Sequence, residues 1–81
     1  MATKNPRKIY EIADDISKCW PNVSPAALPY LQAMMALNQI TDKYVLDSAE
    51  DILIRFLANA QYWRGEDARR IKAEINALLG N

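Results

Sequence analysis

The sequence predicts an all-α fold: a compact bundle or array of about four helices that forms a single domain over residues 1–81. Apolar residues recur three and four positions apart, and no stretch alternates in the manner of a β-strand. Both glycines, Gly65 and Gly80, fall where a helical pattern ends. Apolar residues make up 51% of the chain, which is enough to fill one core.

The first helix is expected to begin at Asn5, because Pro6 then lies in the first turn, where its missing N–H costs nothing. It should end at Trp20, since the residue before Pro21 is disfavoured in the α region. Its core-facing stripe consists of Ile9, Ile12, Ile16 and Cys19 or Trp20.

A loop with Ser24 as a candidate cap is expected between residues 21 and 29. The second helix then runs from Pro29 to about Ile40, with apolar residues on most of its sides. Residues 41–46 form a connection, in which a short helical turn would hold Tyr44 against the core.

The third helix has the clearest signals. Asp47 and Glu50 have the spacing of a capping box and predict its start, while Gly65 predicts its end. One continuous stripe faces the core: Ala49, Ile52, Leu53, Phe56, Leu57, Ala60 and Trp63.

The fourth helix is predicted from Glu66 to Leu79, with Gly80 as the residue that follows its C-cap. Acidic residues in its first turn favour the positive end of the helix dipole. Its inward residues are Ala68, Ile71, Ile75, Leu78 and Leu79.

The composition excludes several kinds of chemistry. There is no histidine, so histidine bases, Ser-His and Cys-His nucleophiles and imidazole metal sites are impossible. Cys19 is the only cysteine and is expected to be a small buried apolar residue. The acidic residues between Asp42 and Asp51 lack the ligand spacing of a calcium loop. We therefore expect no enzymatic activity, no metal and no cofactor.

Residues 19–41 carry no charge, but prolines and amides interrupt them. The longest apolar run, from Ala33 to Leu37, is far shorter than the roughly 18 residues of a membrane span. No apolar run follows the first residues either, so no signal peptide is expected. A lone cysteine fits a reducing compartment, and the expected location is cytoplasmic.

The basic residues Arg64, Arg69 and Lys72 are the candidate contact for nucleic acid or another partner. Ten basic and ten acidic residues cancel, however, so no long-range field attracts phosphates. The expected turn at Arg64-Gly65 is shorter than that of a helix-turn-helix. Glu66–Arg70 and Arg70–Glu74 are spaced as ion pairs on a solvated helix face. Nucleic-acid binding is thus the alternative function.

The segment from residue 56 to residue 72, above all its corner Trp63-Arg64-Gly65-Glu66, resembles short uncharacterised open reading frames of bacteriophages and of integrated elements in gut bacteria. The resemblance implies a phage or bacterial cytoplasmic origin. It implies no established activity, so it assigns no functional residue. The corner itself predicts a rigid helix–helix junction, or alternatively an Arg64 guanidinium held beside the indole for a partner.

The first functional hypothesis is a non-enzymatic protein-interaction module, either an adaptor or a homo-oligomer, with a homodimer expected. The third helix carries a second apolar row, Ile54, Ala58 and Tyr62, which its own core does not need. The second helix has apolar residues on most sides. The candidate interface residues are Met34, Met35, Ile54 and Tyr62, unless a central position of either helix buries them internally.

Overall fold

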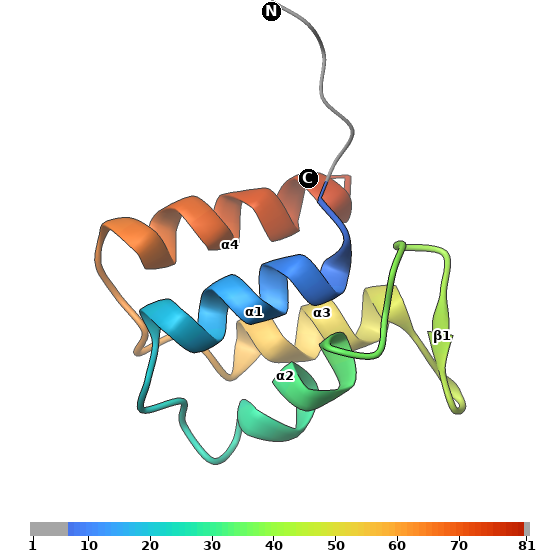
Figure 1. The fold of residues 1–81 in the computed structure, drawn as a ribbon, viewed down its shortest axis with the longest axis horizontal. Helices are drawn as coiled ribbons and strands as arrows, with labels where there is room; N and C mark the ends of the chain where they lie inside the picture. Colours follow the sequence, from blue (N-terminus) through green and yellow to red (C-terminus); the bar gives the residue numbers. More distant parts are fainter. Residues whose placement is uncertain (1–6, 81) are drawn as a thin grey trace, which may run out of the picture.

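Helices pack around a shared apolar core in the computed structural model, which describes residues 7–80 (Figure 1). α1 packs against α2 and α4, and α2 packs against α3. More than half of the described residues are helical, which confirms the all-α class. The sheet is a two-stranded hairpin, which the sequence analysis did not predict. The elements are α1 (Ile9–Cys19), α2 (Leu28–Met34), β1 (Lys43–Tyr44), β2 (Asp47–Ser48), α3 (Ala49–Ala58) and α4 (Glu66–Leu78).

The core contains most of the predicted stripes of α1, α3 and α4, whereas Cys19, Leu57, Leu78 and Leu79 are only partly buried and pack against it. In each of these helices, apolar residues three or four positions apart lie on the inner face and are almost inaccessible to solvent. The largest side chains with less than 2% exposure are Phe56, Ile9, Ile12, Ile16, Leu31, Met34, Leu37, Leu53, Ile71 and Ile75.

α1 begins at Ile9, four residues after the expected N-cap Asn5, which lies outside the described residues together with Pro6. Its first N–H groups have partners in the segment after α2: Ile9 N donates to Asn38 O at 2.9 Å and Tyr10 N to Leu37 O at 3.0 Å. These tertiary hydrogen bonds satisfy the first N–H groups of the helix, and the Glu11 carboxylate accepts from Lys8 N at 2.7 Å. The end of α1 at Trp20 is as predicted.

α2 is much shorter than predicted and stops at Met34. The Leu37 N–H donates to the Met34 carbonyl at 3.0 Å, a tight turn in place of helix. The next amides, those of Asn38 and Gln39, donate to the Asp42 carboxylate at 2.9 and 3.0 Å. Asp42 therefore holds the chain in a turn before the helix can continue to Ile40. The candidate cap Ser24 does accept a hydrogen bond, from Ala27 N at 3.3 Å.

The connection after α2 is a hairpin, not a helical turn. Lys43 pairs with Ser48 and Tyr44 with Asp47, and Val45 and Leu46 form the turn. Tyr44 is 40% exposed and does not lie in the core, contrary to the expectation. The hairpin stands at the edge of the helical body (Figure 1).

α3 begins one residue later than the predicted cap implies. Its N-cap is Ser48, whose hydroxyl accepts from Asp51 N at 3.1 Å, because Asp47 is paired in the hairpin. The helix also ends early, at Ala58, where the Asn59 side chain donates to the Arg55 carbonyl at 2.8 Å. Trp63 thus lies in a linker of residues 59–65, not on α3.

Gly65 was predicted to end the third helix. It is instead the N-cap of α4, with φ 115° and ψ −179°. This region of backbone space is essentially restricted to glycine. Gly80 follows the C-cap Leu79 with φ 87°, in the predicted role.

The side chain of Trp63 packs the linker against the core. The ring of Trp63 stacks on that of Trp20, with centroids 5.1 Å apart and planes at 3°. Trp20 in turn meets Phe56 edge-on, at 6.3 Å and 73°. Trp63 is only 5% exposed, so its indole is buried as predicted, although it lies in the linker and not at the end of α3.

Trp63→Ala should lower the free energy of unfolding by about 3–5 kcal/mol, because it removes a buried indole together with its stack on Trp20. Urea unfolding followed by circular dichroism measures the change. The neighbouring Tyr62 is 92% exposed, so Tyr62→Ala is the matched control and should change stability by less than about 0.5 kcal/mol. Equal effects of the two substitutions would contradict the assigned burial.

Candidate functional site

The three predicted basic contact residues converge on one place. Arg64, Arg69 and Lys72 line a shallow hollow of about 320 Å³ together with Trp63, Gly65 and Ala68. Arg64 comes from the linker, and the other two lie three residues apart on α4, which places them on the same face. We call this group of three side chains the basic corner. Its hollow has no acidic side chain in its lining.

Lys72 is the most tightly held member of the basic corner. Its ammonium group donates to the Trp63 carbonyl at 2.7 Å and lies 5.9 Å from the centroid of the Trp63 ring. The cation over the indole is therefore Lys72, whereas the alternative interpretation of the sequence had placed Arg64 beside it. Burial lowers the pKa of Lys72, and the nearby positive charge of Arg64 lowers it further.

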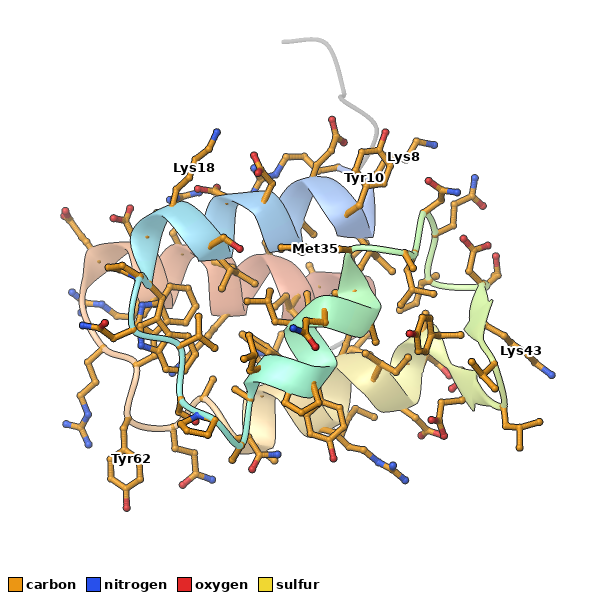
Figure 2. All side chains as sticks on the ribbon, turned by 60° about the horizontal axis from the view of Figure 1, so that its bottom comes forward. Lys8, Tyr10, Lys18, Met35, Lys43 and Tyr62 are labelled. Carbon is orange, nitrogen blue, oxygen red and sulfur yellow. The ribbon has the colours of Figure 1, made fainter. Side chains whose placement is uncertain are left out.

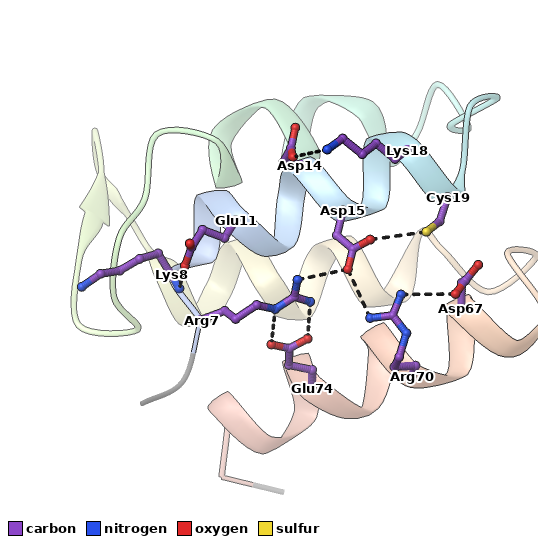
Figure 3. A network of polar contacts seen from close by, with 10 residues as sticks. All are labelled: Arg7, Lys8, Glu11, Asp14, Asp15, Lys18, Cys19, Asp67, Arg70 and Glu74. Carbon is purple, nitrogen blue, oxygen red and sulfur yellow. Dashed lines mark hydrogen bonds and ion pairs between the residues drawn. The ribbon is translucent and has the colours of Figure 1, made fainter. Parts of the chain in front are cut away.

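A second charged group joins α1 to α4 (Figure 3). Arg7 forms a two-pronged contact with Glu74 and also reaches Asp15 at 3.1 Å. Arg70 contacts the same Asp15 oxygen at 3.1 Å and Asp67 at 3.2 Å. The predicted pairs of Arg70 with Glu66 and Glu74 are thus replaced by other partners, since α1 supplies a carboxylate between the two arginines.

This charged group is unsuited to acid–base chemistry. Hydrogen bonds from Arg70 hold the pKa of Asp15 below its usual range, with those from Arg7 adding to the effect, so Asp15 stays ionised. The partly buried Cys19 lies with Sγ 3.4 Å from Asp15, and desolvation and Asp15 raise the pKa of its thiol. A thiol that stays protonated is a poor nucleophile. Asp14 turns away and pairs with Lys18 at 3.1 Å.

The candidate interface residues do not form one surface. Met34 is fully buried in the core, so its assignment to an interface was wrong; α2 ends there and places its last side chain inward. Met35, Ile54 and Tyr62 are 47%, 52% and 92% exposed. Met35 and Tyr62 lie on well-separated parts of the molecule (Figure 2).

The most exposed aliphatic side chains belong to the hairpin turn, which the sequence analysis missed as a candidate. Val45 is 80% exposed and Leu46 is 92% exposed. Val45 has φ 59°, a backbone conformation that is rare for a β-branched residue. The available signal was the apolar triplet Tyr44-Val45-Leu46 between polar residues, but the turn lacks the Asn-Gly pattern that usually marks a hairpin.

Comparison of the chain with protein-family models, with characterised proteins and with solved structures finds no match. Within residues 7–80, no helix has the length and apolar character needed to cross a bilayer. The same residues contain no cluster of three or more side chains suited to hold a metal ion. The geometry of the described residues offers two candidate surfaces, the basic corner and the hairpin turn.

Asp15→Asn should make stability less dependent on pH. Because its folded-state pKa is lowered, Asp15 stabilises the fold above its unfolded pKa of about 3.9, and this stabilisation is lost as the pH falls through the lower folded-state value. At pH 7 the substitution should cost roughly 1–2 kcal/mol, and the difference from wild type should shrink near pH 2. Urea unfolding across this pH range measures both effects.

The control for this experiment is Asp14→Asn, since Asp14 is 66% exposed and pairs with a lysine that is 75% exposed. Exposed pairs of this kind contribute little, so the change should stay below about 0.5 kcal/mol. A loss at Asp14 as large as that at Asp15 would show that the α1–α4 contact is not the source of the effect.

Proposed function

We propose that the protein is a non-enzymatic interaction module that docks on another protein chain through the turn of its hairpin, with a second copy of itself as the simplest partner. The observation that carries this proposal is the exposure of Val45 and Leu46, at 80% and 92%, on a hairpin outside the core. Apolar residues in such a position are favoured at protein interfaces when they cluster.

Val45 adds an energetic argument. A β-branched residue at φ 59° costs about 1–3 kcal/mol relative to an unstrained backbone. Neither this strain nor the exposure of Leu46 stabilises the isolated chain. A partner that covers the turn offsets the strain, because burial of Val45 and Leu46 then removes apolar surface from water.

A second copy is a suitable partner for two reasons. The hairpin has two strands only, so within the described residues neither β1 nor β2 has a further strand on its outer edge. The net charge of zero also gives no long-range repulsion between copies. A symmetric dimer would place the two turns against each other or against the same neighbouring surface.

Several observations support a non-enzymatic role. The chain has no histidine, and its one cysteine has a raised pKa. The partly buried carboxylates of Asp15 and Glu74 are neutralised by arginines. These two carboxylates are therefore engaged in contacts that hold the helices together.

The first test compares Leu46→Asp with Tyr62→Asp in sedimentation equilibrium. Both residues are 92% exposed, so neither substitution should disturb the core. We expect a wild-type dimer at micromolar concentration, a folded monomer for Leu46→Asp, and a dimer for Tyr62→Asp. Dissociation by Tyr62→Asp alone would place the interface beside α3 instead. A wild-type monomer at high concentration would exclude the second copy as partner.

The second test is Val45→Asn, which separates stability from association. Asparagine tolerates a positive φ, so the substitution should raise the free energy of unfolding by roughly 1 kcal/mol. It also replaces an exposed apolar side chain by a polar one, so dimerisation should weaken. Urea unfolding and sedimentation measure the two effects. A variant that is less stable than wild type would contradict the strained turn.

A further inference from the structure

The basic corner holds positive charges together without a negative partner. In the described part of the chain, the basic side chains in ion pairs are Arg7, Lys18 and Arg70, and none of them belongs to the corner. Arg64, Arg69 and Lys72 nevertheless surround one hollow. Like charges at short range repel, so the arrangement is unfavourable until an anion lies between them.

The fold keeps Lys72 in this position by specific contacts. Its bond to the Trp63 carbonyl and its position over the indole fix the ammonium group at the edge of the hollow. The Trp63 ring is itself fixed by its stack on Trp20. Lys72 is therefore already ordered in the free protein, and a ligand meets little entropic cost in ordering this side chain.

The hollow also restricts the chemistry of its ligand. Its lining combines three cationic side chains with nonpolar atoms. A ligand that fits combines an anion for the cations with an apolar part for the hollow. Guanidinium groups bind phosphate oxygens through paired hydrogen bonds and also stack on aromatic bases.

We propose that the basic corner binds single-stranded nucleic acid, with phosphates on Arg64, Arg69 and Lys72 and one base in the hollow. This site goes beyond the proposed protein interaction and does not depend on it, because the hairpin contributes no residue to the hollow. With three cations and a neutral chain, the contact covers only two or three phosphates.

A duplex fits the surface less well. A helix that reads a groove presents donors along its exposed length. On α4 the intervening Arg70 is directed to Asp15 and Asp67 on the side of α1 (Figure 3). Glu66 and Asp67 lie in the first turn, where a groove-reading helix contacts its bases. The free positive charge is thus confined to the corner, which suits a flexible strand that can bend to it.

The test is fluorescence anisotropy with labelled single strands of RNA and of DNA, about 10 nucleotides long, at salt concentrations from about 50 to 200 mM. We expect micromolar binding at low salt and a slope of log K against log salt near −2, from about −0.7 for each of three contacts. Comparing the affinity for the RNA single strand with that for the DNA single strand shows which nucleic acid supplies the phosphates. Either one binding in this manner supports the proposal.

Three variants locate the contact. Arg64→Ala, Arg69→Ala and Lys72→Gln should each weaken binding roughly three- to tenfold and reduce the slope by about 0.7. Glutamine retains a donor for the Trp63 carbonyl, so Lys72→Gln should still fold, and circular dichroism checks this. Arg55→Ala is the matched control: Arg55 is exposed on α3 and does not line the hollow, so binding should be unchanged.

Four outcomes would overturn the proposal. They are absence of binding to either single strand at low salt, an equal loss with Arg55→Ala, tighter binding of a duplex of the same length, and tighter binding of a phosphopeptide than of the single strands. The last two would assign the corner to a different macromolecule. Quenching of indole fluorescence by the bound strand would add support, because Trp63 lines the hollow.

Discussion

The stacked indoles of Trp20 and Trp63 connect two parts of the chain that no helix joins. Trp20 ends α1, and Trp63 lies in the linker before α4. Since both rings also contact the core, the stack fixes the direction in which α4 leaves the linker. The Trp63 carbonyl then positions Lys72, and the basic corner follows from that contact. Without the stack, the linker that carries Arg64 would be less firmly placed beside Arg69 and Lys72 of α4.

The sequence predicts the fold correctly where the signal comes from residues close together in the chain. Apolar spacing identified the inner faces of three helices, and Pro21 and Gly80 marked two helix ends correctly. The wrong predictions concern helix ends that are set by hydrogen bonds to residues elsewhere in the chain. Asp42 stops α2 by binding amides several residues upstream, and α1 begins at Ile9 because carbonyls after α2 accept its N–H groups. Spacing alone does not encode such tertiary hydrogen bonds.

The candidate site residues also divide into those that local sequence patterns predict and those whose positions depend on the tertiary structure. The basic corner was predictable because Arg69 and Lys72 share a face of α4, although the contact of Lys72 with the indole was not predicted. The apolar row on α3 correctly indicated that Ile54 is exposed, whereas Met34 entered the core because α2 is short. The hairpin turn escaped notice since its Val45 occupies a conformation that sequence rules reserve for glycine or asparagine.

The α1–α4 contact also has a consequence for the order in which the chain folds. Arg7 and Glu74 are 67 residues apart, and Asp15 and Arg70 are 55 apart. Closing such long loops costs more conformational entropy than forming the neighbouring contact of α2 with α3. The segment from α2 to α3 can therefore assemble first, and α4 docks late.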